Sequence, residues 1–283
     1  MANLAEVLPG VEERLKPGSA SARVLDYLRT MERRDLPKAL AMQAPGFTMQ
    51  FPNGQTYTTL EQLFAYSVPR QKRALKTFEA FEETADGRVV FCFGMLHGEK
   101  VDGSPFRDIR FVDRFALGAD GRFVEQTVYN DLAILGFGPG DYPIQPPPVQ
   151  VRNDAAAEGA ASKLVLKYLR AMEQGRYDEA KAMFAPGFFM LFPGNQRFTT
   201  VEEVLAGMAK RGSYAIKTFY RFDECPTDKG IAVYAQGTVA ATLNNGSAYK
   251  DVRFVDRITV RDGKLVDQRV WNDRGEHKES SGR

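Results

Sequence analysis

Apolar residues near the start of the chain recur with the period of an α-helix. They fall at i, i+3, i+4 and i+7: Val24, Tyr27, Leu28 and Met31. The pattern predicts a helix over about residues 20–33 and a shorter one over 36–43, which Pro45-Gly46 should end. A third helix is expected to open at Thr59, because Glu61 close behind it resembles an N-terminal capping arrangement.

Strand patterns occupy most of the chain after these helices. One strand, FTMQF at 47–51, precedes the third helix, and further strands are expected over about residues 75–82, 89–97, 106–117 and 122–130. Asp-Gly pairs of the hairpin type separate the later strands, beginning at Asp86, Asp102 and Asp120. Three helices followed by a meander of long strands predict an α+β fold, with about three helices on one face of a curved antiparallel sheet.

The chain contains this pattern twice. YLRTME at Tyr27 recurs as YLRAME at Tyr168, 141 positions later, and blocks such as APGF and KTF keep the same shift. RFVDR at 110–114 recurs at 253–257, shifted by 143 positions, so the small slips fall in hairpin loops. These repeats predict a tandem duplication.

The duplication sets the expected domain boundaries. They are an N-terminal extension over 1–19, a first domain over 20–135, a Pro/Gly/Ala-rich linker over 136–162, a second domain over 163–274 and a polar tail over 275–283. The proline run in the linker favours an extended, semi-rigid connector. We therefore expect an internal pseudo-dimer, and a further homodimer is left open.

Composition and charge narrow the classes of function. A net charge of +2 over 283 residues gives no electrostatic reason to expect nucleic acid or an anionic membrane as partner. The only cysteines, Cys92 and Cys225, fit no metal spacing, and two histidines exclude a histidine-rich metal site. Two lone thiols favour a reducing compartment. Because the sequence has neither a signal-peptide pattern nor an apolar run of membrane-spanning length, we expect a cytoplasmic protein.

The repeated RFVDR block places an aspartate inside an apolar strand. Strand alternation puts Asp113 on one face with three apolar residues: Ile109, Phe111 and Phe115. This face should line a pocket, and a carboxyl that is desolvated there without a cationic neighbour should have a raised pKa. It would then stay protonated at neutral pH and donate a hydrogen bond. Asp256 should do the same in the second copy.

These motifs resemble the nuclear transport factor two-like superfamily, which includes SnoaL-like cyclases and ketosteroid isomerases. VLDYLRTMERRDL…FTMQFPNG and VDRFALGADGRFV align with the ketosteroid isomerase segments that carry the oxyanion-hole tyrosine and aspartate, which fall at Tyr27 and Asp113. The matching pair in the second copy is Tyr168 and Asp256. The resemblance implies a cone of curved sheet and helices around one apolar pocket. The pair would then form an oxyanion hole for a carbonyl or phenol oxygen.

The chain departs from ketosteroid isomerases at the catalytic base, whose position holds Phe51 and Phe192. The candidates to replace that base are His97, at the end of a strand, and one aspartate after the last strand of each copy, Asp131 in the first and Asp273 in the second. Substrate contacts are expected from aromatic and amide side chains with pocket parity, with Tyr66 as a weaker candidate. The set is Phe51, Tyr57, Phe111, Phe115, Asn130, Phe192, Phe254 and Asn272.

The resemblance implies a cofactor-independent lyase, isomerase or cyclase that uses acid–base chemistry on a small, apolar, oxygenated and in some cases aromatic substrate. A carbon–carbon lyase is favoured, and no metal is expected. A non-catalytic ligand-binding or assembly module is the alternative, because both copies lack the base. An epoxide hydrolase is a further alternative, since Asp108-x-Arg110 with Asp131 resembles, in reversed order, the Asp–Arg–Asp set of limonene-type enzymes.

Structural roles for the same residues stay open at this stage. The two strand aspartates could accept hydrogen bonds from an arginine across the sheet, Tyr27 could be a core side chain, and His97 could lie at the surface beside a turn.

Overall fold

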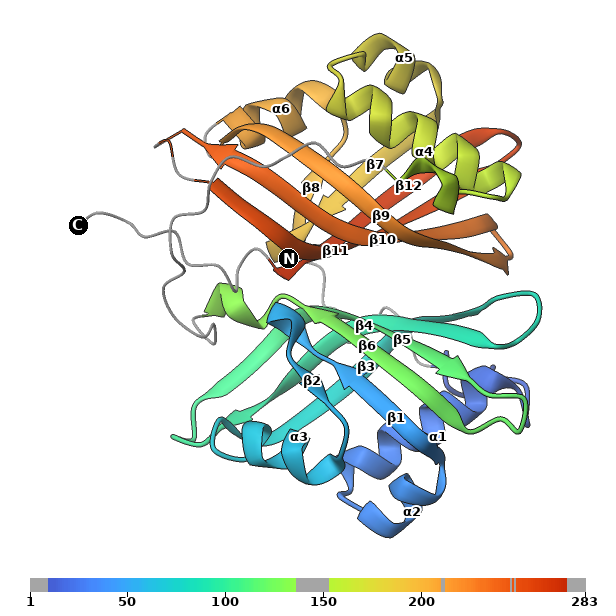
Figure 1. Ribbon diagram of the computed structural model, residues 1–283, viewed down its shortest axis with the longest axis vertical. Helices are drawn as coiled ribbons and strands as arrows, with labels where there is room; N and C mark the ends of the chain where they lie inside the picture. The colour runs from blue at the N-terminus through green and yellow to red at the C-terminus, as the bar shows by residue number, and fades with distance from the viewer. Residues whose placement is uncertain (1–9, 136–152, 210–211, 245, 247, 274–283) are drawn as a thin grey trace. The chain divides into compact units, whose positions relative to one another are not determined.

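The computed structural model describes residues 10–135, 153–209, 212–244, 246 and 248–273, and the chain divides into two compact units after Asn130. Each unit combines helices with one six-stranded sheet, which confirms the α+β fold with two tandem domains (Figure 1). The internal pseudo-dimer stays a prediction, and the expected linker lies outside the described residues as far as residue 152.

Both units have the same order of elements. The first consists of α1 (Ala20–Glu32), α2 (Leu36–Ala41), β1 (Gln43–Gln50), the 3-10 turn η2 (Pro52–Gly54), β2 (Thr56–Tyr57), α3 (Leu60–Ser67), β3 (Gln71–Glu83), β4 (Val89–Lys100), β5 (Pro105–Leu117) and β6 (Phe123–Asn130). After η3 (Leu132–Leu135), the second consists of η4 (Asp154–Ala156), α4 (Ala160–Glu173), α5 (Tyr177–Ala182), β7 (Phe184–Phe192), η5 (Pro193–Asn195), β8 (Gln196–Phe198), α6 (Val201–Ala209), β9 (Gly212–Thr227), β10 (Gly230–Leu243), β11 (Ala248–Arg261) and β12 (Lys264–Asn272). Helix α4 therefore begins inside the range expected for the linker.

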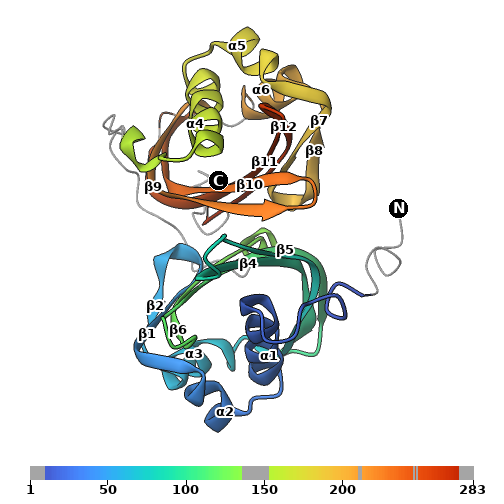
Figure 2. The same cartoon turned by 90° about the vertical axis from the view of Figure 1, so that its right-hand side faces the viewer.

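Helix α1 buries the apolar face that its sequence period predicts. The Ser19 hydroxyl caps the helix by accepting a hydrogen bond from the N–H of Ala22 at 3.2 Å. Val24 and Tyr27 are fully buried. Figure 2 shows α1 lying inside the curve of its own sheet, and α4 lies the same way in the second unit. Each unit is thus a cone whose interior lies between its first helix and its sheet.

The sheets are mixed rather than wholly antiparallel. Strands β3 to β6 form the expected antiparallel meander, but β1 pairs with β6 in parallel, giving the order β2-β1-β6-β5-β4-β3. The chain between β1 and β6 is long enough to return β6 in the same direction. Pairing between strands so far apart in sequence leaves no local signal. The second sheet repeats the order as β8-β7-β12-β11-β10-β9.

Pro45-Gly46 does not end the second helix, as the sequence had suggested. Helix α2 ends at Ala41 and β1 has already begun at Gln43. Gly46 has a φ of +77° and lies where the β1–β6 register shifts between Gln43 and Thr48. The pair therefore forms a bulge within a strand, a place that favours glycine.

Strand register confirms the alternation predicted for β5. Asp113 pairs with Cys92 on β4 and with Val128 on β6, and opposite residues in antiparallel strands share a face. Lys76 on β3 also reaches Asp113, so these side chains lie on the concave face that covers α1. Arg114 lies on the other face, where its guanidinium binds Glu125 at 2.8 Å.

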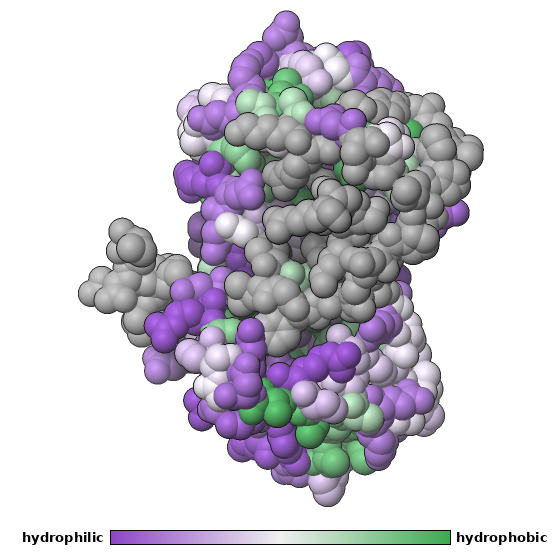
Figure 3. Space-filling model, turned by 90° about the vertical axis from the view of Figure 1, so that its left-hand side faces the viewer, coloured by the Kyte–Doolittle hydropathy of each residue, from purple (hydrophilic) through white to green (hydrophobic). Residues whose placement is uncertain are grey.

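The surface mixes polar and apolar residues. Among the coloured residues of Figure 3, hydrophilic ones are more frequent and smaller hydrophobic groups lie between them. Among the described residues, none of the helices has both the length and the apolar character needed to cross a membrane.

Candidate ligand-binding site

The second unit encloses a cavity of about 710 Å³ between α4, α5, α6 and the sheet. Its wall is mainly apolar and includes Leu169, Met172, Met190, Phe192, Val204 and Leu205. Polar residues also line it, namely Tyr168, Glu173, Tyr177, Lys217, Asn244 and Gln268. This volume and composition are typical of small-molecule sites, in which a few polar groups orient a mostly apolar ligand.

A buried ion pair forms the polar part of this wall. The Lys217 ammonium on β9 donates to Oδ2 of Asp256 on β11. The aspartate is completely buried, whereas 23% of the lysine side chain is exposed. The ammonium also lies 4.4 Å from the ring centroid of Phe254, within range of a cation–π contact. Because Lys217 lines the cavity with the carboxylate as its buried counter-ion, a ligand would meet the ammonium.

Gln268 connects this ion pair to the tyrosine. Its Nε2 donates to Asp256 Oδ2 at 3.4 Å, and its Oε1 accepts from the Tyr168 hydroxyl at 2.7 Å. Burial raises the pKa of Tyr168, and the negative charge of Asp256 raises it further. The phenol therefore stays neutral at physiological pH. The hydroxyl donates its hydrogen bond to Gln268 rather than to a ligand oxygen.

The expectation that each strand aspartate lacks a cationic neighbour is wrong in both units. Lys76 binds Asp113 in the first unit as Lys217 binds Asp256 in the second. Burial still raises the pKa of Asp113, although the charge of Lys76 and the hydrogen bonds from Lys76 and Gln126 act in the opposite direction. The alternative of an arginine partner also fails, because the cation is a lysine. The lysine ammonium of each unit is thus the hydrogen-bond donor at the position where a protonated aspartate had been expected to donate.

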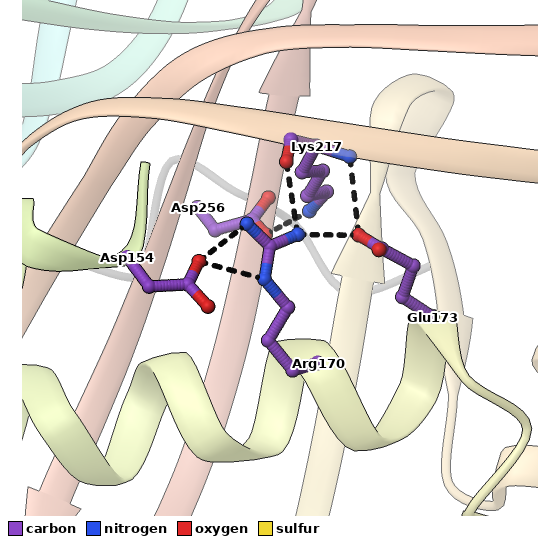
Figure 4. Close-up of polar contacts among 5 residues, drawn as sticks. All are labelled: Asp154, Arg170, Glu173, Lys217 and Asp256. Carbon is purple, nitrogen blue, oxygen red and sulfur yellow. Dashed lines mark hydrogen bonds and ion pairs between the residues drawn. The ribbon is translucent and has the colours of Figure 1, made fainter. Parts of the chain in front are cut away.

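An arginine on α4 holds the backbone of the cavity lysine (Figure 4). Arg170 Nη1 donates to the carbonyl oxygen of Lys217 at 2.9 Å and to Glu173 Oε2 at 2.6 Å, and Glu173 accepts from the Lys217 N–H at 3.2 Å. The other guanidinium nitrogens bind Asp154 Oδ1 at 2.6 and 2.9 Å. The two side chains thus hold the N–H and the carbonyl oxygen of Lys217, which fixes the backbone from which its side chain extends.

The first unit has the same set of hydrogen bonds around its lysine. Arg29 donates to Glu32 at 2.7 Å and to the Lys76 carbonyl oxygen at 3.0 Å, and Glu32 accepts from the Lys76 N–H at 2.9 Å. Glu12, in the segment before α1, binds Arg29 in the way that Asp154 binds Arg170. The tyrosines of the two units differ in their hydrogen bonds, because the Tyr27 hydroxyl accepts one from Gln43 Nε2 at 2.8 Å.

The predicted aromatic residues surround these groups. Phe111 and Phe254 each lie 4.4 Å from the lysine ammonium of their unit. Phe115 packs against Tyr27 with ring centroids 5.8 Å apart. The ring centroids of Phe51 and Tyr57 lie 5.6 Å apart. Burial is the largest of the causes that raise the pKa of Tyr57 to about 12.

The two predicted asparagines share the face of the ion pair, whereas the three predicted base residues make other contacts. Asn130 and Asn272 pair with Phe111 and Phe254, so they share the concave face. His97 pairs with Leu75, the neighbour of Lys76, and so lies on the opposite face of β4. In the second unit Asp273 accepts from Arg253 Nε at 2.9 Å. Asp131 accepts from the N–H of Gly194 at 2.9 Å.

Sequence reasoning missed the lysines, the glutamines and the Arg–Glu clamp. A usable signal was present, since Lys76 and Lys217 begin the identical KTF blocks, and Arg29 and Glu32 lie in the repeated YLRxME block. In the part of the chain that the structure describes, no three His, Cys, Asp or Glu side chains gather as a metal site.

Comparisons with known proteins agree with this architecture. Residues 165–268 match the family model of the SnoaL-like domain. No curated protein matches the sequence significantly. The matched residues lie in the second unit, and the first unit repeats the strand order of that unit.

Solved structures of single-unit length are similar to one unit of this chain. A nuclear transport factor two-like protein of unknown function from Burkholderia pseudomallei is 21% identical, with a TM-score of 0.37, covering 41% of this chain and 93% of its own. A candidate polyketide cyclase from Pseudomonas putida is 16% identical, with a TM-score of 0.34, covering 39% and 90%. TerC co-crystallised with polyporic acid is 16% identical, with a TM-score of 0.37, covering 41% and 95%.

Proposed function

We propose that the second unit binds a small, largely apolar, oxygen-bearing molecule and acts on it by acid–base chemistry. In this proposal the Lys217 ammonium stabilises negative charge that develops on a carbonyl or phenol oxygen of the ligand. The observation that carries it is a charged lysine at the wall of an apolar cavity, with its counter-ion completely buried behind it.

The physical basis is the low dielectric of the cavity. A charge-assisted hydrogen bond is stronger there than in water, and a donor that is already held in place needs no reorganisation as charge develops. Lys217 has three N–H donors, and Asp256 takes one of them. The others can reach a ligand oxygen. Arg170 and Glu173 hold the lysine backbone, so the donor is positioned before the ligand arrives.

The reaction class follows from the species that this site favours. Enolate and phenolate intermediates occur when bonds next to a carbonyl or an aromatic hydroxyl are shifted, closed or broken. We therefore place the protein among cofactor-independent lyases, isomerases and cyclases, with carbon–carbon cleavage favoured. The Lys217–Asp256 pair would also hold the proton that such a step moves.

A non-catalytic ligand-binding module is the second candidate. Phe192 favours it, because this apolar side chain lines the cavity at the position where ketosteroid isomerases carry their base. The epoxide hydrolase loses support, since Arg110 alternates with Phe111 and so lies on the face of β5 opposite Asp113.

Titration with 4-nitrophenol tests the proposal, because its ionised form absorbs visible light. We expect the wild type to favour the bound phenolate, and Lys217→Met to weaken phenolate binding by about 10- to 100-fold, the value of a charge-assisted hydrogen bond. Lys167→Met makes the same change at an exposed position on α4 and should bind like the wild type.

Loss of folding must be separated from loss of binding, since Lys217→Met leaves a buried carboxylate. The Lys217→Met/Asp256→Asn double variant removes both charges and should fold, yet should still fail to favour phenolate. If the folded double variant binds phenolate as the wild type does, the role of Lys217 is wrong.

A further inference from the structure

We propose that Lys217 is also a nucleophile, which forms a Schiff base with an aldehyde or ketone carbonyl in the cavity of the second unit. The inference rests on the proposed function, because it requires a carbonyl ligand in contact with this lysine. It gives the substrate class a sharper definition: a molecule with an accessible carbonyl carbon rather than a phenol alone.

The position of Lys217 suits attack on a carbonyl. Its side chain lines an apolar cavity and is only 23% exposed. The flat face of Phe254 covers it on one side, and Met172 and Met190 line the same space. A ligand that fills this apolar space would exclude water from the lysine, which would protect an imine formed there from hydrolysis.

Asp256 is placed to accept the proton that must leave the lysine first. Its Oδ2 accepts directly from the ammonium, while its Oδ1 is buried and has no hydrogen-bond partner among the described residues. The direct hydrogen bond gives the proton a short path between the two groups. Moving the proton from Lys217 to Asp256 removes both charges from the wall at once.

The covalent step balances without any added reagent. Lys217 gives one proton to Asp256 and attacks the carbonyl carbon with its lone pair, so a C–N bond forms, the π bond of the carbonyl breaks, and a proton moves from the nitrogen to the oxygen, which becomes a hydroxyl. Asp256 returns its proton to that hydroxyl, which leaves as water, and the nitrogen, which keeps its last proton, forms the C=N bond of a protonated imine. The protonated imine draws electrons from the bond between the α and β carbons of the ligand, the role that a carbon–carbon cleaving enzyme requires.

The Arg170 and Glu173 clamp supports this role more strongly than simple ligand binding. It holds the carbonyl oxygen and the N–H of Lys217 from one helix, at 2.9 and 3.2 Å. A lysine that only contributed charge could tolerate a mobile backbone. A nucleophile needs the reacting atoms held within a few tenths of an ångström, which such a clamp provides.

Reductive trapping tests the inference on the full chain. The protein is incubated with 4-hydroxybenzaldehyde and sodium cyanoborohydride, and intact mass and peptide mass spectrometry locate the reduced adduct. We expect Lys217 to be labelled at least about tenfold faster than the exposed lysines and the adduct to be lost in Lys217→Arg, whose guanidinium keeps the charge but is not a nucleophile. Lys167→Met should retain the adduct on Lys217.

Slow labelling spread evenly over exposed lysines, unchanged in Lys217→Arg, would overturn the inference. The same aldehyde is also titrated without reductant by following its absorbance. Binding that Lys217→Met abolishes, with no adduct trapped on Lys217, refutes the Schiff base and leaves the proposed function standing. Absence of any binding by the wild type refutes both.

Discussion

The two units share their buried polar groups and differ in other residues that line the cavity of the second unit. Each places a lysine on a buried aspartate and holds that lysine with an arginine and a glutamate from its first helix. Gly175 lines the cavity of the second unit, whereas the first has Arg34 at the equivalent place. Both residues have positive φ, +73° and +58°, so the backbone is conserved while the side chain changes.

Arg34 has a specific effect on its unit. Its Nη2 donates to the carbonyl oxygen of Lys72 on β3 at 2.9 Å, which carries a long side chain from the end of α1 across to the sheet. Nearby, Leu36 and Ser67 replace Tyr177 and Met208 of the second unit. The same buried polar groups therefore have different neighbours in the two units, and we expect the two units to admit different ligands.

One interior substitution also changes how the tyrosine is used. Gln43 of the first unit is replaced by Phe184, which stacks on Phe188 with ring centroids 3.9 Å apart. Tyr27 accepts a hydrogen bond from Gln43, but Tyr168 donates to Gln268. In the second unit the hydroxyl thereby joins the network of the ion pair.

The largest expected effect concerns the shared ion pair. Lys217→Met should lower the free energy of unfolding by about 3 kcal/mol, because it leaves Asp256 as an uncompensated buried charge, and Lys76→Met should lower it by a similar amount. The Lys217→Met/Asp256→Asn double variant should recover most of the loss. Urea denaturation measures all three, and a loss confined to one unit would break the similarity between them.

The substitution at Gly175 should have a smaller effect, confined to ligand binding. Gly175→Arg should copy the first unit and reduce the affinity of the second unit for 4-nitrophenol about tenfold, or about 1.4 kcal/mol. An arginine can adopt this backbone conformation, since Arg34 has a positive φ at the equivalent position. Gly187→Arg is the matched control, because Gly187 also has a positive φ of +77° and is exposed, and it does not line the cavity. Equal affinity in both variants would show that the residue at position 175 does not select ligands.

The smallest effect is a dependence on pH in the first unit. Because burial raises the pKa of Asp113 above its ordinary value of 3.8, the folded chain keeps this proton at pH values where the unfolded chain has lost it. The stability contributed by Asp113 is thus present below the unfolded pKa and is lost as pH rises through the folded pKa. Asp113→Asn should flatten this fall, by less than about 1 kcal/mol per pH unit.

Unfolding free energies measured between pH 4 and pH 7 check this prediction. Asp120→Asn is a useful control, because hydrogen bonds from Arg122 lower the pKa of that exposed carboxyl and its dependence has the opposite sign. A slope that Asp113→Asn leaves unchanged would mean that Lys76 keeps Asp113 ionised throughout.

Much of the fold followed from local patterns in the sequence. The helical period around Tyr27, the capping residue Thr59 and the Asp-Gly turns act over a few residues, so the order of elements could be predicted. The repeat then transferred each prediction to the second unit. The β1–β6 pairing could not be predicted, since it joins strands that are distant in sequence.

The site was only half predictable for a similar reason. Alternation gives the face of Asp113 correctly, but it does not tell which cation on another strand meets that face. Lys76 and Asp113 are 37 positions apart, and Lys217 and Asp256 are 39 apart, with a whole strand between each pair. A lysine of the KTF block therefore occupies the place considered for an arginine across the sheet.

The ion pair between Asp154 and Arg170 extends the structural repeat ahead of the first helix. Asp154 precedes the first helix of its unit, as Glu12 does in the other, and each binds the arginine of the clamp. The repeated unit therefore includes the acidic segment before the helix. Any attempt to express one half alone should keep that segment attached.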